Sequence, residues 1–279
     1  MTHPKININD LQPGNITVLG IPFDNNSSFL KGPALAPPRI REELLSPATN
    51  LFTENGIDLG ERSDWHNIDD MLLSDNQTAF ATIEHSASDL LTRGLRVITL
   101  GGDHSITYPI IRAFAKEYEK LSILQLDAHP DLYDELEGNP YSHACPFARI
   151  MEEKLASRLV QVGIRTMTDH QREQADRFGV EVIEMQDMGL VQGLTFEGSV
   201  YVSLDMDCLD PAFAPGVSHY EPGGLSTREV LTLIQGLKGN LVGADIVEFN
   251  PDRDPLGITG TVAAKFLKEI LGRMLADTI

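Results

Sequence analysis

The chain is poor in cysteine and has no long apolar run, and each shortage excludes a class of protein. Two cysteines among 279 residues, Cys145 and Cys208, cannot build a disulfide framework, so we expect a reducing compartment and a packing role for both thiols. No apolar run approaches the roughly 18 residues of a membrane-spanning helix, so we expect no membrane span. The polar start MTHPKININDLQPGN lacks the apolar core of a signal peptide, and a cytoplasmic location is the resulting prediction.

Basic residues are scarce as well. The chain has 22 Lys and Arg against 41 Asp and Glu, which gives a formal net charge of −19. Because nucleic acids bind basic surfaces, this excess of acid argues against a nucleic-acid partner. It is compatible with a cationic small substrate, and equally with an ordinary solvated surface.

Proline- or glycine-rich linkers and internal repeats are absent, so we expect one domain over residues 1–279. Short apolar runs rich in Val, Ile and Leu alternate with helix-length segments, and the runs are continuous, as in strands covered on both faces. This order predicts an α/β fold, a three-layer α-β-α sandwich with a mainly parallel central sheet. The polar segment 46–75 is expected to form a long surface loop with at most one short helix. The predicted strands lie at 16–23, 95–102, 121–127, 159–164, 180–185, 200–207 and 241–249.

Polar clusters follow four of these runs at the points where the strands should end. The carboxyl ends of parallel strands meet at one edge of a sheet, where ligands bind, so we expect the four clusters to converge. Any one of them alone has an ordinary interpretation as a polar turn or a helix cap, whereas all four at strand ends indicate a shared site. The clusters are GGDHS with His104, DAHPD with Asp127, His129 and Asp131, DMDCLDP with Asp205, Asp207 and Asp210, and EFNPDRD with Glu248.

The spacing within these clusters favours metal binding. Residues two apart in an extended segment point the same way, which places Asp127, His129 and Asp131 on one side. Four carboxylates at short range repel one another unless cations compensate them. Carboxylates and imidazoles without a thiolate suit Mn²⁺ or a similar ion, and six ligands suit two ions that share carboxylates. The remaining histidines outside such clusters are expected to have surface or structural roles: His3, His66, His85, His170 and His219.

These motifs together resemble the ureohydrolase family of arginases and agmatinases. Stretches such as IPFDNNSSFLKGPALAPPRIRE and FAPGVSHYEPGGLSTREV most resemble its plant-type arginase branch. The resemblance implies two Mn²⁺ per subunit, a small cationic guanidino substrate and a homotrimer or homohexamer. It further implies that His104, Asp127, Asp131 and Asp205 would hold one ion, and Asp127, His129, Asp205 and Asp207 the other.

The resemblance also assigns catalytic and substrate-binding residues. Asp131 would handle the proton released on attack, His143 would shuttle a proton, and Glu248 would accept the guanidinium. His143 and Glu248 would thus also bind substrate, together with Asn139 in the short loop after DAHPD. Asp169 is a candidate acid for the far end of the substrate.

The substrate is expected to be L-arginine, hydrolysed to L-ornithine and urea, and agmatine or another guanidino compound is the alternative. A zinc deacetylase of the same fold is a further alternative, although it would normally keep one metal and a pair of catalytic histidines. A metal-dependent binding protein without activity is the third hypothesis. The complete two-metal ligand set argues against both.

Overall fold

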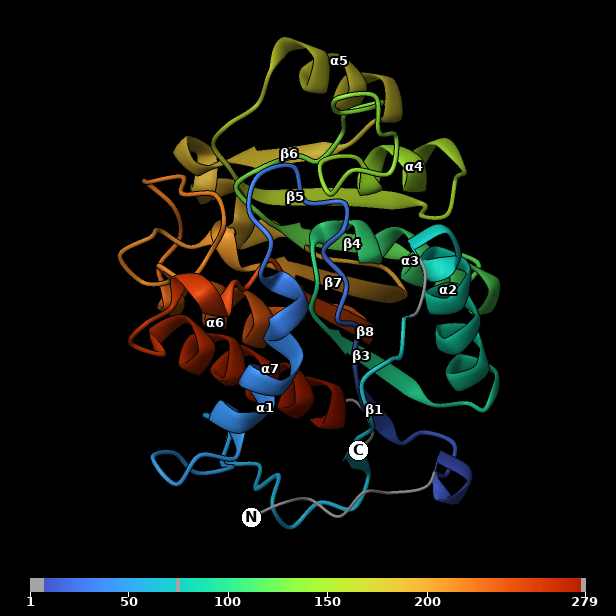
Figure 1. The fold of residues 1–279 in the computed structure, drawn as a ribbon, viewed down its shortest axis with the longest axis vertical. Coiled ribbons are helices and arrows are strands. Elements are labelled where there is room, and N and C mark those ends of the chain that lie inside the picture. Colours follow the sequence, from blue (N-terminus) through green and yellow to red (C-terminus); the bar gives the residue numbers. More distant parts are fainter. Residues whose placement is uncertain (1–7, 74–75, 277–279) are drawn as a thin grey trace.

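A parallel sheet of eight strands runs through the centre of the molecule in the computed structural model, which describes residues 8–73 and 76–276 (Figure 1). The strand order is β2-β1-β3-β8-β7-β4-β5-β6, and all neighbouring pairs are parallel. The seven predicted strands are confirmed, and an eighth is added. The strands are β1 Ile16–Gly20, β2 Trp65–Asn67, β3 Arg96–Leu100, β4 Ser122–Leu126, β5 Arg158–Ile164, β6 Glu181–Glu184, β7 Ser199–Asp205 and β8 Asn240–Val247.

Helices cover both faces of the sheet, with α1, α6 and α7 on one side and α2, α3 and α4 on the other (Figure 1). The buried core divides accordingly into two clusters, and successive strand residues such as Ile123 and Leu124 belong to different clusters. The predicted α-β-α sandwich is therefore confirmed. That all of 1–279 forms one domain stays a prediction. The helices are α1 Ala36–Leu44, α2 Asn76–Thr92, α3 Thr107–Glu117, α4 Pro146–Glu152, α5 Asp169–Phe178, α6 Thr227–Gly236 and α7 Ile258–Ala276.

The segment expected to be a long surface loop contains the edge strand β2, so that prediction is wrong in part. Ile16 of β1 pairs with Trp65, whose side chain is fully buried and donates its indole N–H to the carbonyl of Leu59 at 2.8 Å. A strand of three residues is too short to produce a periodic pattern, and only its pairing with β1 defines it.

Two short helices were not predicted from the sequence. Both α1 and α4 carry proline in their first turn, where the missing backbone N–H costs nothing. In the sequence these prolines obscure the helical pattern that follows them.

The four strands that carry the polar clusters are neighbours in the sheet. Their registers pair Leu100 with Ile246, Ile246 with Leu204, and Leu204 with Leu126, so all four end at one level. The expected convergence is therefore confirmed. The turn after β3 is close-packed, since a Cβ on Gly102 would lie 1.9 Å from the carbonyl oxygen of Phe23.

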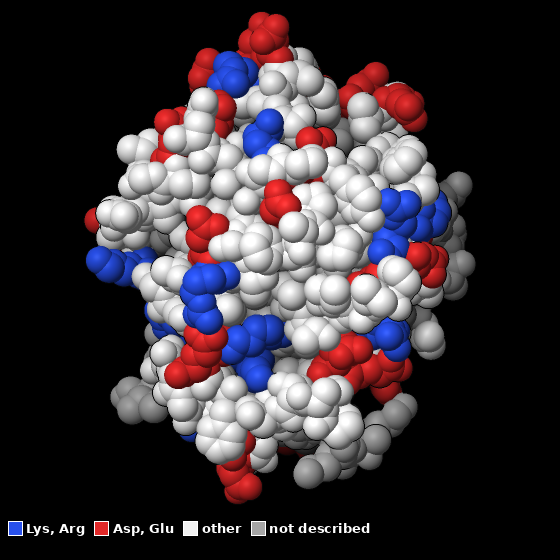
Figure 2. Space-filling model, turned by 90° about the vertical axis from the view of Figure 1, so that its left-hand side faces the viewer, with Lys and Arg blue, Asp and Glu red and all other residues white. Residues whose placement is uncertain are grey.

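Charged side chains are dispersed on the face of the molecule shown in Figure 2. Basic and acidic groups alternate around a broad neutral centre, so this face has no continuous basic surface among the described residues. Within the same part of the chain, no helix has both the length and the apolar character needed to cross a membrane.

Candidate active site

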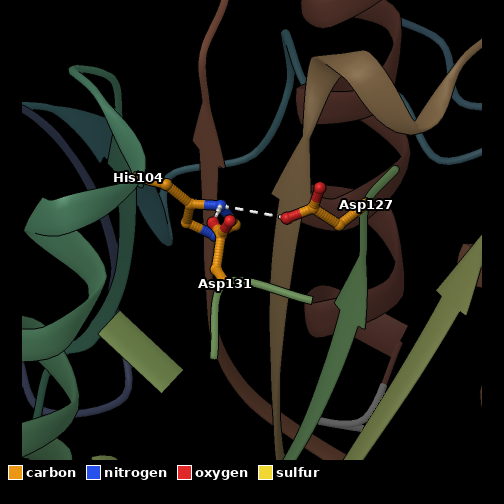
Figure 3. A group of neighbouring side chains, drawn as sticks. All are labelled: His104, Asp127 and Asp131. Carbon is orange, nitrogen blue, oxygen red and sulfur yellow. Dashed lines mark ion pairs between the residues drawn. The ribbon is translucent and has the colours of Figure 1, made fainter. Parts of the chain in front are cut away.

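The first metal-capable group surrounds His104, which begins a 3-10 turn directly after β3. Its ring atom Nδ1 lies 3.1 Å from Asp127 Oδ2, 3.0 Å from Asp131 Oδ2 and 3.2 Å from Asp205 Oδ2. Figure 3 shows the carboxylates of Asp127 and Asp131 directed at this ring. All four side chains are buried, although they come from the ends of three different strands.

The geometry around His104 fits a cation. Its buried Nδ1 has no hydrogen-bond partner among the described residues, despite three carboxylate oxygens close by. A nitrogen and several oxygens that converge without hydrogen-bond alignment are arranged as ligands of one ion. The donor set is oxygen and nitrogen only, as predicted from the sequence.

A second metal-capable group shares Asp127 with the first. It contains Asp127, His129 and Asp207, with one potential ligand atom from each within 4.8 Å of the others. His129 Nδ1 lies 3.0 Å from Asp207 Oδ2 and 3.6 Å from Asp127 Oδ1. A carboxylate common to two adjacent groups is the arrangement that a pair of ions requires.

The electrostatics of the acidic cluster also call for cations. Burial and the charges of Asp207 and Asp127 raise the pKa of the Asp205 carboxyl well above its usual range. Burial and the charge of Asp127 likewise raise the pKa of Asp131 to about 6. Divalent cations remove this mutual repulsion and keep the carboxylates ionised.

The backbone is strained at two predicted site residues. Asp131 has φ 51° and Glu248 has φ 62°, and only two other non-glycine residues in the described part of the chain have positive φ. Such left-handed conformations are costly for residues with a Cβ, and they accumulate at functional sites. Both side chains line the same cavity at the strand ends.

An outer layer of buried polar groups supports the ligands. His104 Nε2 lies 2.9 Å from Ser203 Oγ, and Ser203 donates to Asp245 Oδ1 at 2.7 Å. Gln125 donates from Nε2 to Asp127 Oδ2 at 2.7 Å. We did not predict this layer, although Asp245 within the apolar run LVGADIV is a signal that could have revealed it.

A cavity of about 230 Å³ opens above the acidic cluster. Asp131, Asp205 and Asp207 line it together with Glu248 and His143. The carboxylate atom Glu248 Oε1 lies 2.8 Å from His143 Nδ1 and accepts the backbone N–H of His104 at 2.9 Å. The cavity is therefore small, polar at its floor and open to a ligand.

Comparison with known proteins identifies the family. Residues 14–272 match the arginase family. The chain belongs to this family. It is 48% identical over 275 residues to "Arginase 1, mitochondrial" of Arabidopsis thaliana, with 92% of this chain and 80% of that protein covered. It is 34% identical over 272 residues to "Guanidino acid hydrolase, mitochondrial" of Homo sapiens, with 91% and 76% covered.

A solved structure supports the same assignment. The arginase from Medicago truncatula superposes with a TM-score of 0.89 at 44% identity, covering 94% of this chain and 87% of that one. The protein is thus an arginase-family hydrolase that acts on guanidino C–N bonds, and the family is metal-dependent.

The arginase-family site contains most of the predicted residues but not all of them. Asn139 does not line the cavity; its amide bonds to Asn26 Oδ1 and to the backbone N–H of Tyr141, and it borders a neighbouring hollow. Asp169 is exposed at the start of α5 and also lies outside the cavity. The metal-capable residues, His143 and Glu248 do come together: His104, Asp127, His129, Asp131, Asp205, Asp207, His143 and Glu248.

His219 is a cavity residue that the sequence reasoning assigned to an ordinary role. Its ring lies 6.0 Å from that of His129, 5.4 Å from that of His143 and 5.5 Å from that of Phe29. Burial and the neighbouring His143 lower the pKa of His219. It sits in the loop between β7 and α6, and only the path of that loop brings it over the cavity. His3 lies outside the described residues.

The predicted cytoplasmic location is contradicted by the comparisons. The arginases of Arabidopsis thaliana similar to this chain are named mitochondrial, and chloroplastic/mitochondrial. The prediction depended on the composition of the first residues, and the chain spans 80% of the length of each of these relatives. The polar start of this sequence therefore does not decide location.

Proposed function

We propose that this arginase-family hydrolase converts L-arginine to L-ornithine and urea. The observation that carries the proposal is the cavity whose floor holds two carboxylate-sharing ligand groups beside the buried Glu248. Similarity to plant arginases supports arginine, since identity to the human guanidino acid hydrolase is lower. Agmatine and other guanidino compounds are the alternative substrates.

We propose two Mn²⁺ as the cofactor. His104, Asp127, Asp131 and Asp205 would hold one ion, and Asp127, His129, Asp205 and Asp207 the other. A pair of such ions lowers the pKa of water and so supplies a hydroxide nucleophile near neutral pH. The purely oxygen and nitrogen donor set supports manganese over structural zinc.

Glu248 is proposed to orient the guanidinium. Its Oε1 already accepts from His104 and His143, whereas Oε2 has no hydrogen-bond partner among the described residues. A guanidinium that donates to Oε2 would form charge-assisted bonds without displacing either existing donor.

Two further residues are proposed to move protons. Asp131 lies on the cavity floor, where it can accept the proton released when water attacks the guanidino carbon. His143 bonds to Glu248, next to the guanidinium, and is placed to protonate the departing amine. The products are then neutral urea and an amine.

The far end of the cavity supports arginine over agmatine. Outside the metal-capable residues and Glu248, the cavity lining has no carboxylate; it includes Tyr133, Leu136, Thr166, Thr168 and Gln171. A zwitterionic head group balances its own charge and needs only hydroxyl and amide partners. The lone ammonium of agmatine would instead be buried without a counter-ion.

The deciding experiment measures urea release by the protein loaded with Mn²⁺. We expect turnover of L-arginine to exceed that of agmatine and 4-guanidinobutyrate. A higher kcat/KM for agmatine would make agmatine the substrate in place of L-arginine. No urea from any of the three compounds would overturn the proposed hydrolase function. We further propose a homotrimer or homohexamer, and sedimentation or mass photometry of the loaded protein tests it.

A further inference from the structure

The two ring nitrogens of His143 have different, fixed neighbours. Nδ1 lies 2.8 Å from Glu248 Oε1, toward the floor of the cavity. Nε2 lies 2.8 Å from Ser28 Oγ and 3.2 Å from the backbone N–H nitrogen of Ser28. Ser28 thus presents both its hydroxyl and its backbone N–H to Nε2, from a loop 115 positions away in the chain.

Hydrogen-bond chemistry fixes the proton on the neutral ring. A backbone N–H can only donate, so Nε2 must accept, and the ring proton belongs on Nδ1, facing Glu248. When Nε2 is protonated, the backbone N–H of Ser28 can no longer donate a hydrogen bond to it. Only the Ser28 hydroxyl can then accept, because a hydroxyl both donates and accepts. Ser28 therefore offers a partner for each protonation state of Nε2.

The loop that carries Ser28 is anchored beside the metal-capable cluster. The backbone N–H of Asn26 donates to Asp103 Oδ2 at 2.9 Å, and the hydroxyl of Ser27 lies 3.3 Å from the same oxygen. The backbone N–H of His143 donates to the carbonyl of Asn26 at 3.1 Å. Asp103 is fully buried, whereas Ser28 itself is exposed and lines the cavity. Ser28 therefore connects a fixed imidazole with solvent.

We propose that Ser28 is the positioning residue of His143, holding its tautomer and passing a proton from solvent water to Nε2. In this step solvent water gives a proton to Ser28 Oγ as the Ser28 hydroxyl hydrogen moves to Nε2, which leaves a hydroxide in the solvent. Nδ1 then releases its hydrogen to the leaving amine. The ring returns to its Nδ1–H form when the proton that Asp131 accepted from the attacking water reaches Nδ1 and Nε2 gives its proton back through Ser28 to the hydroxide. Over the cycle one proton leaves the attacking water and one arrives on the amine. The role of Ser28 rests on the proposed hydrolysis of a guanidino substrate.

The charges around His143 explain why this acceptor matters. Burial lowers the pKa of His143, but Glu248, Asp103 and Asp131 outweigh it and raise the pKa to about 9, while His219 is the remaining titratable neighbour. Whenever the ring is charged, its Nε2–H needs the Ser28 oxygen as acceptor. Without that oxygen the charged ring loses its acceptor, so the pKa of His143 falls.

The test compares Ser28→Ala, Ser28→Thr and Ser27→Ala in the Mn²⁺-loaded enzyme. We expect Ser28→Ala to keep metal content and KM within about twofold and to lose on the order of 10-fold in kcat. Its alkaline limb should move to lower pH, and its solvent isotope effect should increase. Ser28→Thr retains a hydroxyl and should recover most of kcat. Ser27→Ala removes a hydroxyl of the same loop that faces Asp103 rather than His143. The backbone N–H of Asn26 still anchors the loop on Asp103, so the pH profile of this variant should match the wild type.

Three results would overturn the inference. They are a Ser28→Ala enzyme with wild-type kcat and pH profile, a Ser28→Thr enzyme no better than Ser28→Ala, and a loss of kcat that tracks lost metal. The wild type is assayed first, which separates the two proposals. A wild type that releases no urea from any guanidino substrate overturns the proposed function, whereas an active wild type with an unaffected Ser28→Ala variant overturns only the role of Ser28.

Discussion

His104 Nε2 lies 2.9 Å from Ser203 Oγ, on the side of the ring opposite the three carboxylates. Ser203 donates its single hydroxyl hydrogen to Asp245 Oδ1, so its oxygen must accept a hydrogen bond from Nε2–H of His104. The lone pair of Nδ1 then points at the carboxylates, as a metal ligand requires.

Removing this support should weaken metal binding. We expect Ser203→Ala to reduce metal affinity by about 10- to 100-fold, because His104 loses the partner that fixes its tautomer and orientation. Titration of the metal-free variant with Mn²⁺ measures the change. Ser122→Ala, at another buried serine of the sheet, is the matched control. Equal affinities for Ser203→Ala and the control would contradict the prediction.

Loss of the Asp127 carboxylate, which both ligand groups share, should weaken the binding of both ions. Asp127→Asn is expected to lower the metal content and to reduce kcat on the order of 1,000-fold, since both ligand groups contain Asp127. Metal analysis and urea release measure the two effects. Asp210→Asn, at a nearby carboxylate outside both groups, should leave two ions bound. Full occupancy in Asp127→Asn would refute the ligand assignment.

Glu248 should act mainly through the guanidinium. Glu248→Gln keeps the shape but removes the charge, so kcat/KM for L-arginine should fall on the order of 10- to 100-fold. Steady-state kinetics at equal metal loading measure this loss. Glu221→Gln is the matched glutamate control: Glu221 is not part of the cavity lining, its Oε1 lies 3.8 Å from His129 Nε2, and the change should affect kcat/KM far less. Similar losses in both variants would point to a general effect of charge.

Chelation should destabilise the fold as well as stop the reaction. Metal that binds only the folded state adds about 3 to 4 kcal/mol at 100 to 1,000 times its Kd. Each kcal/mol corresponds to about 2–4 °C for a domain of roughly 150–250 residues. EDTA should therefore lower Tm by roughly 5–15 °C in a calorimetric scan, and added Mn²⁺ should restore it. An unchanged Tm would contradict a metal-compensated cluster.

Glu54 links its loop to α6 and α7, and its contribution should depend on pH. Bonds from Arg228, then from Gln235, hold the pKa of Glu54 well below its usual range. Stability from such a depressed pKa is present above the unfolded pKa and lost as pH falls toward the folded one. Glu54→Gln should thus cost about 1 kcal/mol at neutral pH after solvent screening, and less near pH 3.

Urea unfolding at the two pH values measures the difference. Glu197→Gln changes an exposed glutamate with no ion pair among the described residues, and it should show no such trend. A cost of Glu54→Gln that is the same at both pH values would rule out the ion-pair explanation.

Local sequence patterns predicted most of the strands and most of the residues of the candidate site. Apolar runs identify strands because side-chain burial repeats along a few residues, and the alternate positions of DAHPD place Asp127, His129 and Asp131 on one side. Strand β2 was missed because a three-residue segment has no period, and α1 was missed because prolines open it.

The placement of loop residues did not follow from local pattern. Asn139 sits in the expected loop, yet its amide bonds to Asn26 and turns away from the cavity. His219 carries no metal motif, yet its loop brings it against His143. Both outcomes depend on contacts between distant segments, which no short window of sequence contains.

By itself the sequence determined the strands and the metal-capable motifs at their ends, because these depend on residue type and short spacing. The arginase-type chemistry followed from the resemblance of those motifs to the ureohydrolase family. Only the tertiary structure decided that β8 and β7 lie between β3 and β4, which joins the four motifs. It also decided that Ser28 reaches His143 across 115 positions and that His143 reaches Glu248 across 105. Such pairs form because the packed sheet fixes loop ends in space, and the order of strands in a sheet is not encoded in any one strand.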